Sequence, residues 1–461
     1  MSAAVVGPHP GRSCWFLVAT LLAFAPAAQA QEREPNPADS MLTLDEAVSL
    51  ALEFHPSVRA ARAAERGAAA RAGGVKSEWW PSLRADGSVV QYQRDMLVFP
   101  IHEVSQDAFV FDRTLIQGGL QLGWTLFDGF GRRSRARSAQ AQRQAAGARV
   151  EASEAALLAE VSVTYLEALS ARGVLEAQLQ SLAALGAERE RVERLLEQGQ
   201  AAEVELLRVE AAYAQAEADR IAAAQELDTA ERSLARMLGL DADAVRADRL
   251  APVRLVPGAA VEDRAVLIER YEADSPELAA AQSVREAAEQ AKGAASATWW
   301  PRFDVAGGYQ LFTSPDLDVH DLWQIGLRLS YPLFTGGARS NAVSEAGAQA
   351  AEAEEQLELV RLRGHDAVDR ALARVREQSA RVEALGRAAD HLAEVARIEH
   401  LALEAGRGTQ TDYLSAEAAL RRARATVVRA RHGEIAARVE LARTVGELTP
   451  QWLSTMLEIA R

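Results

Sequence analysis

The chain has 461 residues and a formal net charge of −14, from 65 acidic and 51 basic side chains. Nucleic-acid binding depends on basic groups that meet phosphates, so this acidic balance argues against a nucleic-acid partner. The single cysteine, Cys14, lies close to the N-terminus, so we expect neither a disulfide nor a Cys-ligated metal in the rest of the chain. The length exceeds that of one ordinary domain.

The first thirty residues have the pattern of a secretory signal peptide. Arg12 is their only charged residue, an apolar segment follows it, and a small-x-small cleavage site ends at Ala30. The apolar run is shorter than the ~18 residues that a membrane anchor needs. We therefore expect residues 1–30 to be a signal peptide and residues 31–41, which contain two prolines, to be an N-terminal linker.

A helix is predicted directly after Thr43, which suits the N-cap position. Glu46, three residues later, completes a capping box. Pro56 ends this helix, because the residue before a proline avoids the α region. A second helix is then expected from about residue 57 to residue 78.

Two segments, 82–127 and 302–334, each contain a pair of strands with alternating side chains. Side chains of a strand point to opposite faces in turn, so each pair has one apolar and one polar face. The strands have about the ~9–11 residues of a tilted membrane-crossing strand, although a half-buried soluble hairpin alternates in the same way. The apolar face comprises Leu83, Ala85, Gly87, Val89, Leu120, Leu122, Trp124 and Leu126, then Phe303, Val305, Tyr309, Leu311, Trp323, Ile325, Leu327, Leu329 and Tyr331.

Long helices follow both strand pairs. Residues 132–196 contain no proline and place apolar side chains at steps of three or four, which predicts a helix ~100 Å long at ~1.5 Å per residue. Gly199 interrupts it, and a helix is predicted over 203–238. In the second half the corresponding helices are expected over 338–404 and 410–447, on either side of Gly406.

The chain is predicted to be an internal duplication. The Trp-Trp-Pro motif at 79–81 recurs at 299–301, a displacement of 220, and Phe-x-Gly at 127–129 recurs at 334–336, a displacement of 207. We expect repeat 1 over 42–240, an inter-repeat linker over 241–261, repeat 2 over 262–448 and a C-terminal segment over 449–461.

Four strands per chain are too few to close a barrel, because the smallest common barrels have eight. An open sheet has two edges of unpaired backbone groups, which lipid cannot satisfy by hydrogen bonding. Closure within a bilayer would therefore require two, three or four copies of the chain, and these alternatives stay open.

Several motifs resemble those of the TolC-type outer-membrane efflux proteins. Their order, together with the duplication, covers nearly all of the chain after residue 30. They are Leu42-Thr43-Leu44-Asp45-Glu46-Ala47, both Trp-Trp-Pro motifs, Leu126-Phe127-Asp128-Gly129, Tyr331-Pro332-Leu333-Phe334-Thr335-Gly336-Gly337, and the two tip glycines followed by acidic residues.

The resemblance implies a mainly α fold with β structure. A long α-helical barrel would continue a transmembrane β-barrel that a homotrimer closes with four strands per chain. The implied function is an outer-membrane channel that extends into the periplasm, a passive exit duct of a tripartite efflux or type I secretion system. The implied partners are a periplasmic adaptor (membrane fusion) protein, an inner-membrane pump and outer-membrane lipid. No cofactor is implied, and the exported substrate stays open.

The resemblance also assigns roles to the two helix tips. The family places adaptor contact there, on Gly199, Gln200, Gly406, Arg407 and Thr409. Glycine is also the usual residue just after a helix C-terminus, and both roles can hold together.

Glu205 and Asp412 each follow a tip glycine by six residues. In the family, acidic residues of this part line the narrow periplasmic entrance, and Ser415 stands where some members have a further acidic residue. Compensation of the helix dipole explains both carboxylates equally well.

Aromatic and glycine residues mark the strand–helix junctions. The four tryptophans Trp79, Trp80, Trp299 and Trp300 suit an aromatic belt at the membrane interface or simple packing at the junction. The glycines are expected to permit the strand-to-helix turn through positive φ angles. They are Gly129, Gly131, Gly336 and Gly337.

No catalytic constellation is present in the sequence. It contains no Gly-x-Ser-x-Gly motif, phosphate loop or dinucleotide fingerprint, and no histidine or methionine stripe that suggests metal ligands. His365, His400 and His432 are expected on helix surfaces. We predict neither an enzyme nor a metal site. The competing class is a periplasmic coiled-coil scaffold or adaptor, which would leave the strands unexplained.

Overall fold

The computed structural model describes residues 41–97, 111–256, 262–315 and 317–459. The predicted signal peptide and nearly all of the N-terminal linker lie outside these ranges, as does the connection inside the first hairpin. Residues from Met41 onward form one compact unit.

The first helices begin where local sequence places them. α1 spans Leu44–Phe54 and α2 spans Pro56–Ser77. The capping box is confirmed: the Glu46 backbone N–H donates to Thr43 Oγ1 at 3.2 Å, and the Thr43 N–H donates to a Glu46 carboxylate oxygen at 2.9 Å. Pro56 takes the first position of α2, where its missing N–H costs no hydrogen bond.

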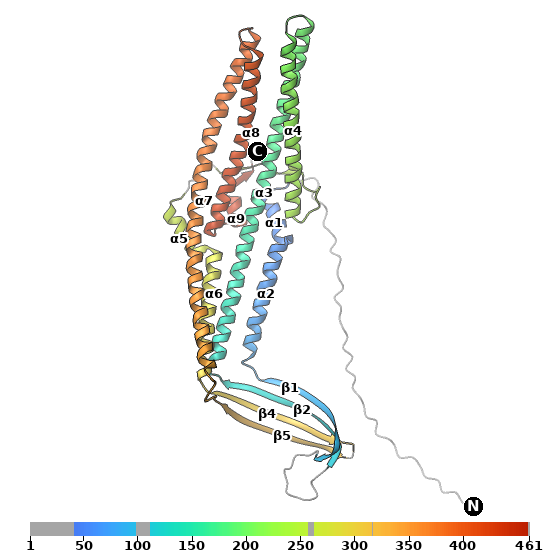
Figure 1. The fold of residues 1–461 in the computed structure, drawn as a ribbon, viewed down its shortest axis with the longest axis vertical. Coiled ribbons are helices and arrows are strands. Elements are labelled where there is room, and N and C mark those ends of the chain that lie inside the picture. The colour runs from blue at the N-terminus through green and yellow to red at the C-terminus, as the bar shows by residue number, and fades with distance from the viewer. Residues whose placement is uncertain (1–40, 98–110, 257–261, 316, 460–461) are drawn as a thin grey trace, which may run out of the picture. The chain divides into compact units, whose positions relative to one another are not determined.

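The order short helix, helix, two strands, long helix, helix occurs twice along the chain (Figure 1). The first series continues with β1 (Ser82–Leu97), β2 (Phe111–Phe127), α3 (Gly131–Glu197) and α4 (Glu203–Met237). The second comprises α5 (Arg264–Asp274), α6 (Pro276–Ser296), the 3-10 turn η3 (Ala297–Trp299), β4 (Arg302–Ser314), β5 (Leu317–Ser330), α7 (Ala338–Glu404) and α8 (Gln410–Val445).

Short elements also lie between the two series and after them. The 3-10 turn η2 (Ala247–Arg249) and strand β3 (Val253–Leu255) fall in the segment predicted to be a linker. Helix α9 (Pro450–Met456) and strand β6 (Leu457–Ile459) end the described chain, and β6 pairs with β3. Strands of three residues carry too little pattern to be recognised from sequence.

The four long strands form one antiparallel sheet in the order β1-β2-β4-β5. The two hairpins share one register: Leu83 pairs with Leu122, and Phe303, which follows Leu83 by 220, pairs with Leu329, which follows Leu122 by 207. β2 joins the hairpins by pairing with β4. Among the described residues, β1 and β5 each pair with one neighbour only, so both outer edges of the sheet are open.

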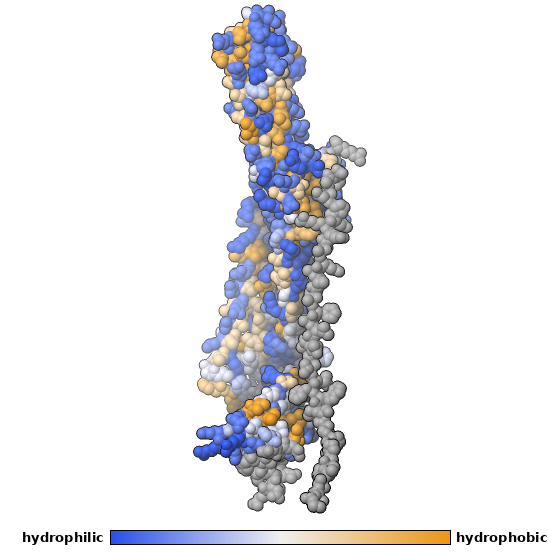
Figure 2. All heavy atoms as spheres, turned by 90° about the vertical axis from the view of Figure 1, so that its right-hand side faces the viewer, coloured by the Kyte–Doolittle hydropathy of each residue, from blue (hydrophilic) through white to orange (hydrophobic). Residues whose placement is uncertain are grey.

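The long helices α3 and α7, each of 67 residues, determine how the others are arranged. α3 contacts α2 over one part of its length and α4 over another, and it also packs against α6 and α8; α7 packs against α6 and α8 (Figure 1). α2 and α4 have 22 and 35 residues, so one continuous helix lies beside two shorter ones. Hydrophobic surface recurs in patches along the helices and at the sheet (Figure 2).

The largest buried cluster lies where α1, the middle of α3, the ends of α4 and α8, and α9 meet. Tyr165 of α3 is fully buried there, and its hydroxyl lies 2.8 Å from the carbonyl oxygens of both Leu42 and Ala251. Burial raises the pKa of this phenol above its usual value, so the hydroxyl stays protonated and donates. The tyrosine therefore ties the segment before α1 to the segment after α4.

One prediction about the junction glycines is wrong. Gly131 does not adopt a positive φ; it is the first residue of α3, and Phe130 takes the left-handed conformation at φ 67° instead. The space around Gly131 is tight, because an added side chain would lie 3.1 Å from Arg135 Nη1 and Asp128 Oδ2 and 3.2 Å from Ala297 Cβ of the second hairpin junction. Gly129, Gly336 and Gly337 do have positive φ, as predicted.

Candidate functional site

The apolar face of the sheet is exposed. Leu327 and Val89 are both 70% exposed, and Leu83, Trp323 and Ile325 are similarly uncovered. Soluble monomers rarely leave a contiguous apolar surface of this kind open, and such surfaces mark contact with lipid or protein. The alternation predicted from sequence therefore produces an outward-facing apolar surface.

The opposite face of the sheet carries hydrogen-bonded polar side chains. Thr125 of β2 donates to Asp304 of β4 at 2.7 Å, while Arg302 donates to both Asp304 (2.9 Å) and Thr125 (2.8 Å). Gln121 and Gln324 lie on this same face by their pairing positions. A polar face of this composition suits water.

Each strand–helix junction holds an arginine against the first tryptophan of a Trp-Trp-Pro motif. The Arg132 guanidinium lies 4.8 Å from the ring centre of Trp79, and its equivalent in the second half, Arg339, lies 4.5 Å from that of Trp299. Such cation–π contacts support a packing role for these two tryptophans. Trp80, the second tryptophan of the first motif, is 77% exposed. Its ring is therefore the one of that motif that is free to contact a membrane interface.

The predicted tip glycines close their helices in the same way. Gly199 and Gly406 both have φ 67°. At the first tip the N–H of Gly199 donates to Leu196 O at 2.9 Å and that of Gln200 to Leu195 O at 2.7 Å, which is a Schellman motif. The second tip repeats it: the N–H of Gly406 donates to Leu403 O at 3.0 Å and that of Arg407 to Ala402 O at 2.8 Å. A side chain at either glycine would meet nothing within 4 Å, so both tips are open to a partner.

The two predicted entrance carboxylates occupy equivalent helix positions. Glu205 is the third residue of α4 and Asp412 the third residue of α8. Asp412 is exposed, and its carboxylate accepts a hydrogen bond from Thr409 Oγ1 at 2.5 Å while Thr409 caps the helix. Both positions favour negative charge through the helix dipole, so the compensation alternative has direct structural support.

A buried polar network links the tips, and no local sequence pattern indicated it. Gln410 donates to Glu188 of α3 at 2.5 Å, and Arg191 donates to both Glu188 (2.7 Å) and Gln410 (3.2 Å). Gln410 and Glu188 are buried. The only nearby signal is the spacing of Glu188 and Arg191, three residues apart on one helix, which does not point to α8. The network fixes the start of α8 against α3.

The expectation that His432 lies on a helix surface is wrong. Its ring is half-buried between α8 and α3, with Nδ1 2.6 Å from Ser170 Oγ. Burial, together with the positive charges of Arg172 and Arg431, lowers the pKa of His432 to about 4. His400 is exposed as predicted, and His365 is partly exposed with Nε2 3.0 Å from Glu272.

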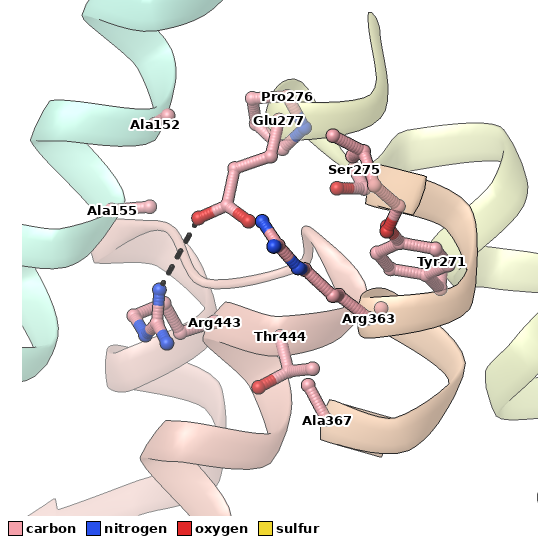
Figure 3. Close-up of a pocket in the computed structure, with 12 residues that line it drawn as sticks. Ala152, Ala155, Tyr271, Ser275, Pro276, Glu277, Arg363, Ala367, Arg443 and Thr444 are labelled. Atoms are coloured by element: carbon pink, nitrogen blue, oxygen red, sulfur yellow. Dashed lines mark hydrogen bonds and ion pairs between the residues drawn. The ribbon is translucent and has the colours of Figure 1, made fainter. Parts of the chain in front are cut away.

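A cavity of about 340 Å³ lies between α3, the α5–α6 connection, α7 and α8 (Figure 3). Glu277 and Arg443 form an ion pair of 3.6 Å across it, and Arg363 points into it from α7. The Tyr271 ring forms one wall, and its hydroxyl donates to Val360 O at 3.0 Å. These side chains bridge packed helices and offer no arrangement for chemistry.

Two features are absent from the ranges that the structure describes. No three His, Cys, Asp or Glu side chains converge there as metal ligands. None of the helices that the structure describes has an apolar stretch long enough to cross a bilayer.

The exposed apolar face of the sheet indicates a protein that contacts lipid or another protein through its strands. The chain belongs to the outer membrane efflux protein family, whose model matches residues 47–240 and 267–447. It is therefore an outer-membrane channel protein and not an enzyme, as the sequence predicted.

Two curated relatives match most of the chain. The protein CyaE of Bordetella pertussis is 29% identical over 426 residues, which cover 87% of this chain and 86% of CyaE. The outer membrane efflux protein BepC of Brucella suis is 25% identical over 360 residues, covering 76% and 75%. The outer membrane protein VceC of Vibrio cholerae shares the fold, with a TM-score of 0.72 at 19% identity over 87% of this chain and 96% of VceC.

Proposed function

We propose that the protein is the passive exit duct of a tripartite efflux or type I secretion system. Three copies would close their sheets into one transmembrane β-barrel in the outer membrane, and their helices would extend into the periplasm. The observation that carries this proposal is the four-stranded sheet with two open edges and an exposed apolar face. Lipid cannot satisfy open edges, so the sheet needs neighbours if that face lies in a bilayer.

The tips supply the contact with partners in this proposal. A periplasmic adaptor would dock at Gly199, Gln200, Gly406, Arg407 and Thr409, and an inner-membrane pump would deliver the substrate. The open space around both glycines supports such docking. Trp80 and Trp300 would lie at the periplasmic interface of the membrane, because both rings are exposed beside the sheet.

Fractionation of the full chain tests the channel. We expect a detergent-extracted oligomer from outer membranes that dissociates only on heating and conducts ions in a planar bilayer. A periplasmic coiled-coil scaffold would instead be recovered as a soluble protein without conductance, and that result would overturn the proposal.

Tip substitutions test the adaptor contact separately. Gly199→Asp and Gly406→Asp should reduce crosslinking to the adaptor while the oligomer still forms. Gly199→Asn is the matched control, because asparagine tolerates the left-handed conformation without adding charge. Loss of the oligomer in the Asp variants would show that the glycines act only in folding.

A further inference from the structure

A cavity of about 680 Å³, separate from the one in Figure 3, lies where the end of α2 and the start of α3 meet the sheet. Each of the four long strands contributes a residue of its polar face: Ser82, Thr125, Asp304 and Arg328. In the proposed channel this face meets water, so the cavity is open to solutes. Its charged lining consists of four arginines and three carboxylates: Arg132, Arg135, Arg302, Arg328, Glu78, Asp128 and Asp304.

The three carboxylates of this cavity are already paired with arginines of the same chain. Asp304 accepts a hydrogen bond from Arg302 Nε at 2.9 Å. Glu78 and Asp128 both accept from Arg135 Nη2, at 2.7 and 3.1 Å. The negative charge of the lining is therefore neutralised within the chain.

Two of these carboxylates lie deeper than their arginine partners. The Arg302 side chain is 59% exposed, whereas that of Asp304 is 22% exposed. The Arg135 side chain is 43% exposed, against 13% for Asp128. A solute in the cavity would therefore meet guanidinium groups before it meets carboxylates.

Arg328 of β5 supplies a positive charge that is not neutralised in this way. It is exposed and lies opposite Asp304 in the pairing of β4 with β5. The Asp304 carboxylate is held by Arg302 instead, and no residue that the structure describes forms an ion pair or hydrogen bond with Arg328. A guanidinium has five N–H donors, so those of Arg328 are free for an acceptor in solution.

The matching junction in the second half has kept an arginine and lost the carboxylates. Thr298 and Thr335 stand where the first half has Glu78 and Asp128. Arg339 of α7 has Nε and Nη1 buried without a hydrogen-bond acceptor in the described part of the chain. Buried donors without an acceptor are rare in folded proteins, so this arginine also needs a partner that its own chain does not supply. Positive charge is in excess at both junctions.

We propose that the cavity around Arg328 and Arg302 is a binding site for an anionic group, such as a phosphate or carboxylate, of solutes that pass through the channel. This inference rests on the proposed function and names a substrate class for it. Guanidinium groups bind phosphate and carboxylate through pairs of N–H donors. Because the cavity opens on the polar face of the sheet, its ligand is a water-soluble anion and not a lipid headgroup.

The position of the site also gives the channel two charged regions of opposite sign. The carboxylates of Asp412 and Glu205 lie at the helix tips, at the other end of the long helices from the sheet. Basic rings favour anions as acidic rings favour cations, and passage requires that each binding step be weak enough to release the solute. An exposed arginine such as Arg328 meets this requirement better than a buried one.

Block of the channel current by inositol hexakisphosphate tests the site in the full-length oligomer. The polyanion is added to the compartment opposite the helix tips, so that it reaches the cavity without passing the tip carboxylates. Salt near 0.1 M keeps the Debye length at ~10 Å. We expect a reversible block of the wild-type channel, and a channel that conducts without any block would overturn the proposal.

Variants of single arginines locate the block. Arg328→Gln removes the unpaired charge without leaving a carboxylate unpaired, and it should weaken the block on the order of tenfold. Arg328→Lys keeps the charge but loses the paired donors, and it should have an intermediate effect. Arg113→Gln is the matched control, because it removes an arginine from the far end of β2, and its block should stay at the wild-type level. Equal weakening in Arg328→Gln and Arg113→Gln would refute a site at this cavity.

Calorimetry separates the failure of this site from the failure of the proposed function. Titration of inositol hexakisphosphate into the detergent-extracted oligomer measures binding without any current. An oligomer that conducts but binds the polyanion equally well with Arg328 and with Arg328→Gln refutes only the anion site. An oligomer that binds the polyanion through Arg328 but does not conduct refutes the exit duct.

Discussion

The ring of Tyr271 on α5 occupies the space that a side chain at Gly364 of α7 would need. The tyrosine is buried, and its hydroxyl donates to the backbone of Val360 at 3.0 Å. A glycine in the middle of a 67-residue helix costs helix stability, and here it makes room for a ring that joins two helices.

Replacing this glycine should therefore destabilise the chain. Gly364→Ala forces Tyr271 away from Val360, and overpacking of this kind costs about 1–3 kcal/mol. Gly347→Ala and Gly386→Ala are matched controls on the same helix, because an added side chain meets nothing within 4 Å at either position. Each should be neutral or stabilising by about 0.5–1 kcal/mol. Denaturant unfolding of the purified protein compares the three, and equal effects would contradict the role of Tyr271.

His432 should make stability depend on pH. Its pKa is lowered to about 4 in the folded chain, against an ordinary value of 6.5. Between these values the unfolded chain binds the extra proton, so stability is complete above about pH 6.5 and falls as pH decreases toward 4. The loss should be on the order of 1–3 kcal/mol. His432→Gln should show a weaker dependence in this window, and an unchanged profile would assign the dependence to other groups.

The two faces of the sheet should respond differently to charge. Leu122→Arg or Leu327→Arg on the apolar face should cost about 2–4 kcal/mol if these positions lie near the bilayer midplane. Gln121→Arg and Gln324→Arg on the polar face should be much milder, because that face meets water. The yield of heat-modifiable oligomer in outer membranes measures both effects, and similar losses at both faces would refute the assignment.

The entrance carboxylates should confer a cation preference. Rings of acidic side chains concentrate cations, and three copies would bring Asp412 and Glu205 around one opening. Asp412→Asn removes the charge but keeps a hydrogen-bonding partner for Thr409, and adding Glu205→Gln removes the second ring. Both the preference for cations and the block by multivalent cations should weaken stepwise in single-channel recordings. The recordings should be made in salt near 0.1 M, where the Debye length is ~10 Å and the carboxylates still act on ions within that distance.

A double variant with unchanged selectivity would place both carboxylates away from the pore. Ser415 offers a test in the opposite direction. Because serine is uncharged, the block by multivalent cations should be weaker than it would be with an acidic residue at this position. Ser415→Asp should strengthen the block if its side chain faces the same opening. No gain in that variant would indicate that Ser415 points elsewhere.

Sequence predicted the elements whose signals are local. α3 begins one residue before the predicted 132–196 segment and ends one residue after it, because glycines mark both limits. The capping box at Thr43 and the alternation of the strands are likewise properties of a few consecutive residues. Such signals also placed Gly199 and Gly406 at helix ends, where both have a positive φ.

The features that sequence missed depend on residues far apart in the chain. Glu188 meets Gln410 across 222 positions, and Ser170 meets His432 across 262. In both pairs, the sequence around one residue does not identify its partner. Gly131 illustrates a subtler failure: Ala297, from the other half of the chain, approaches it closely, and no turn rule describes such an approach. The position of the entrance carboxylates relative to a pore involves other copies and stays a prediction.

The shared register of the two hairpins determines how many equivalent binding positions a ring of assembled copies would offer to a ligand. Each ring position would be repeated twice per chain in backbone shape, but the charge can differ between the two repeats, as at Gln121, which corresponds to Arg328. A ligand that recognises the shape of the wall would find twice as many places as there are chains. One that recognises a particular charge would find half as many, so the stoichiometry of a complex would reveal which of the two is recognised.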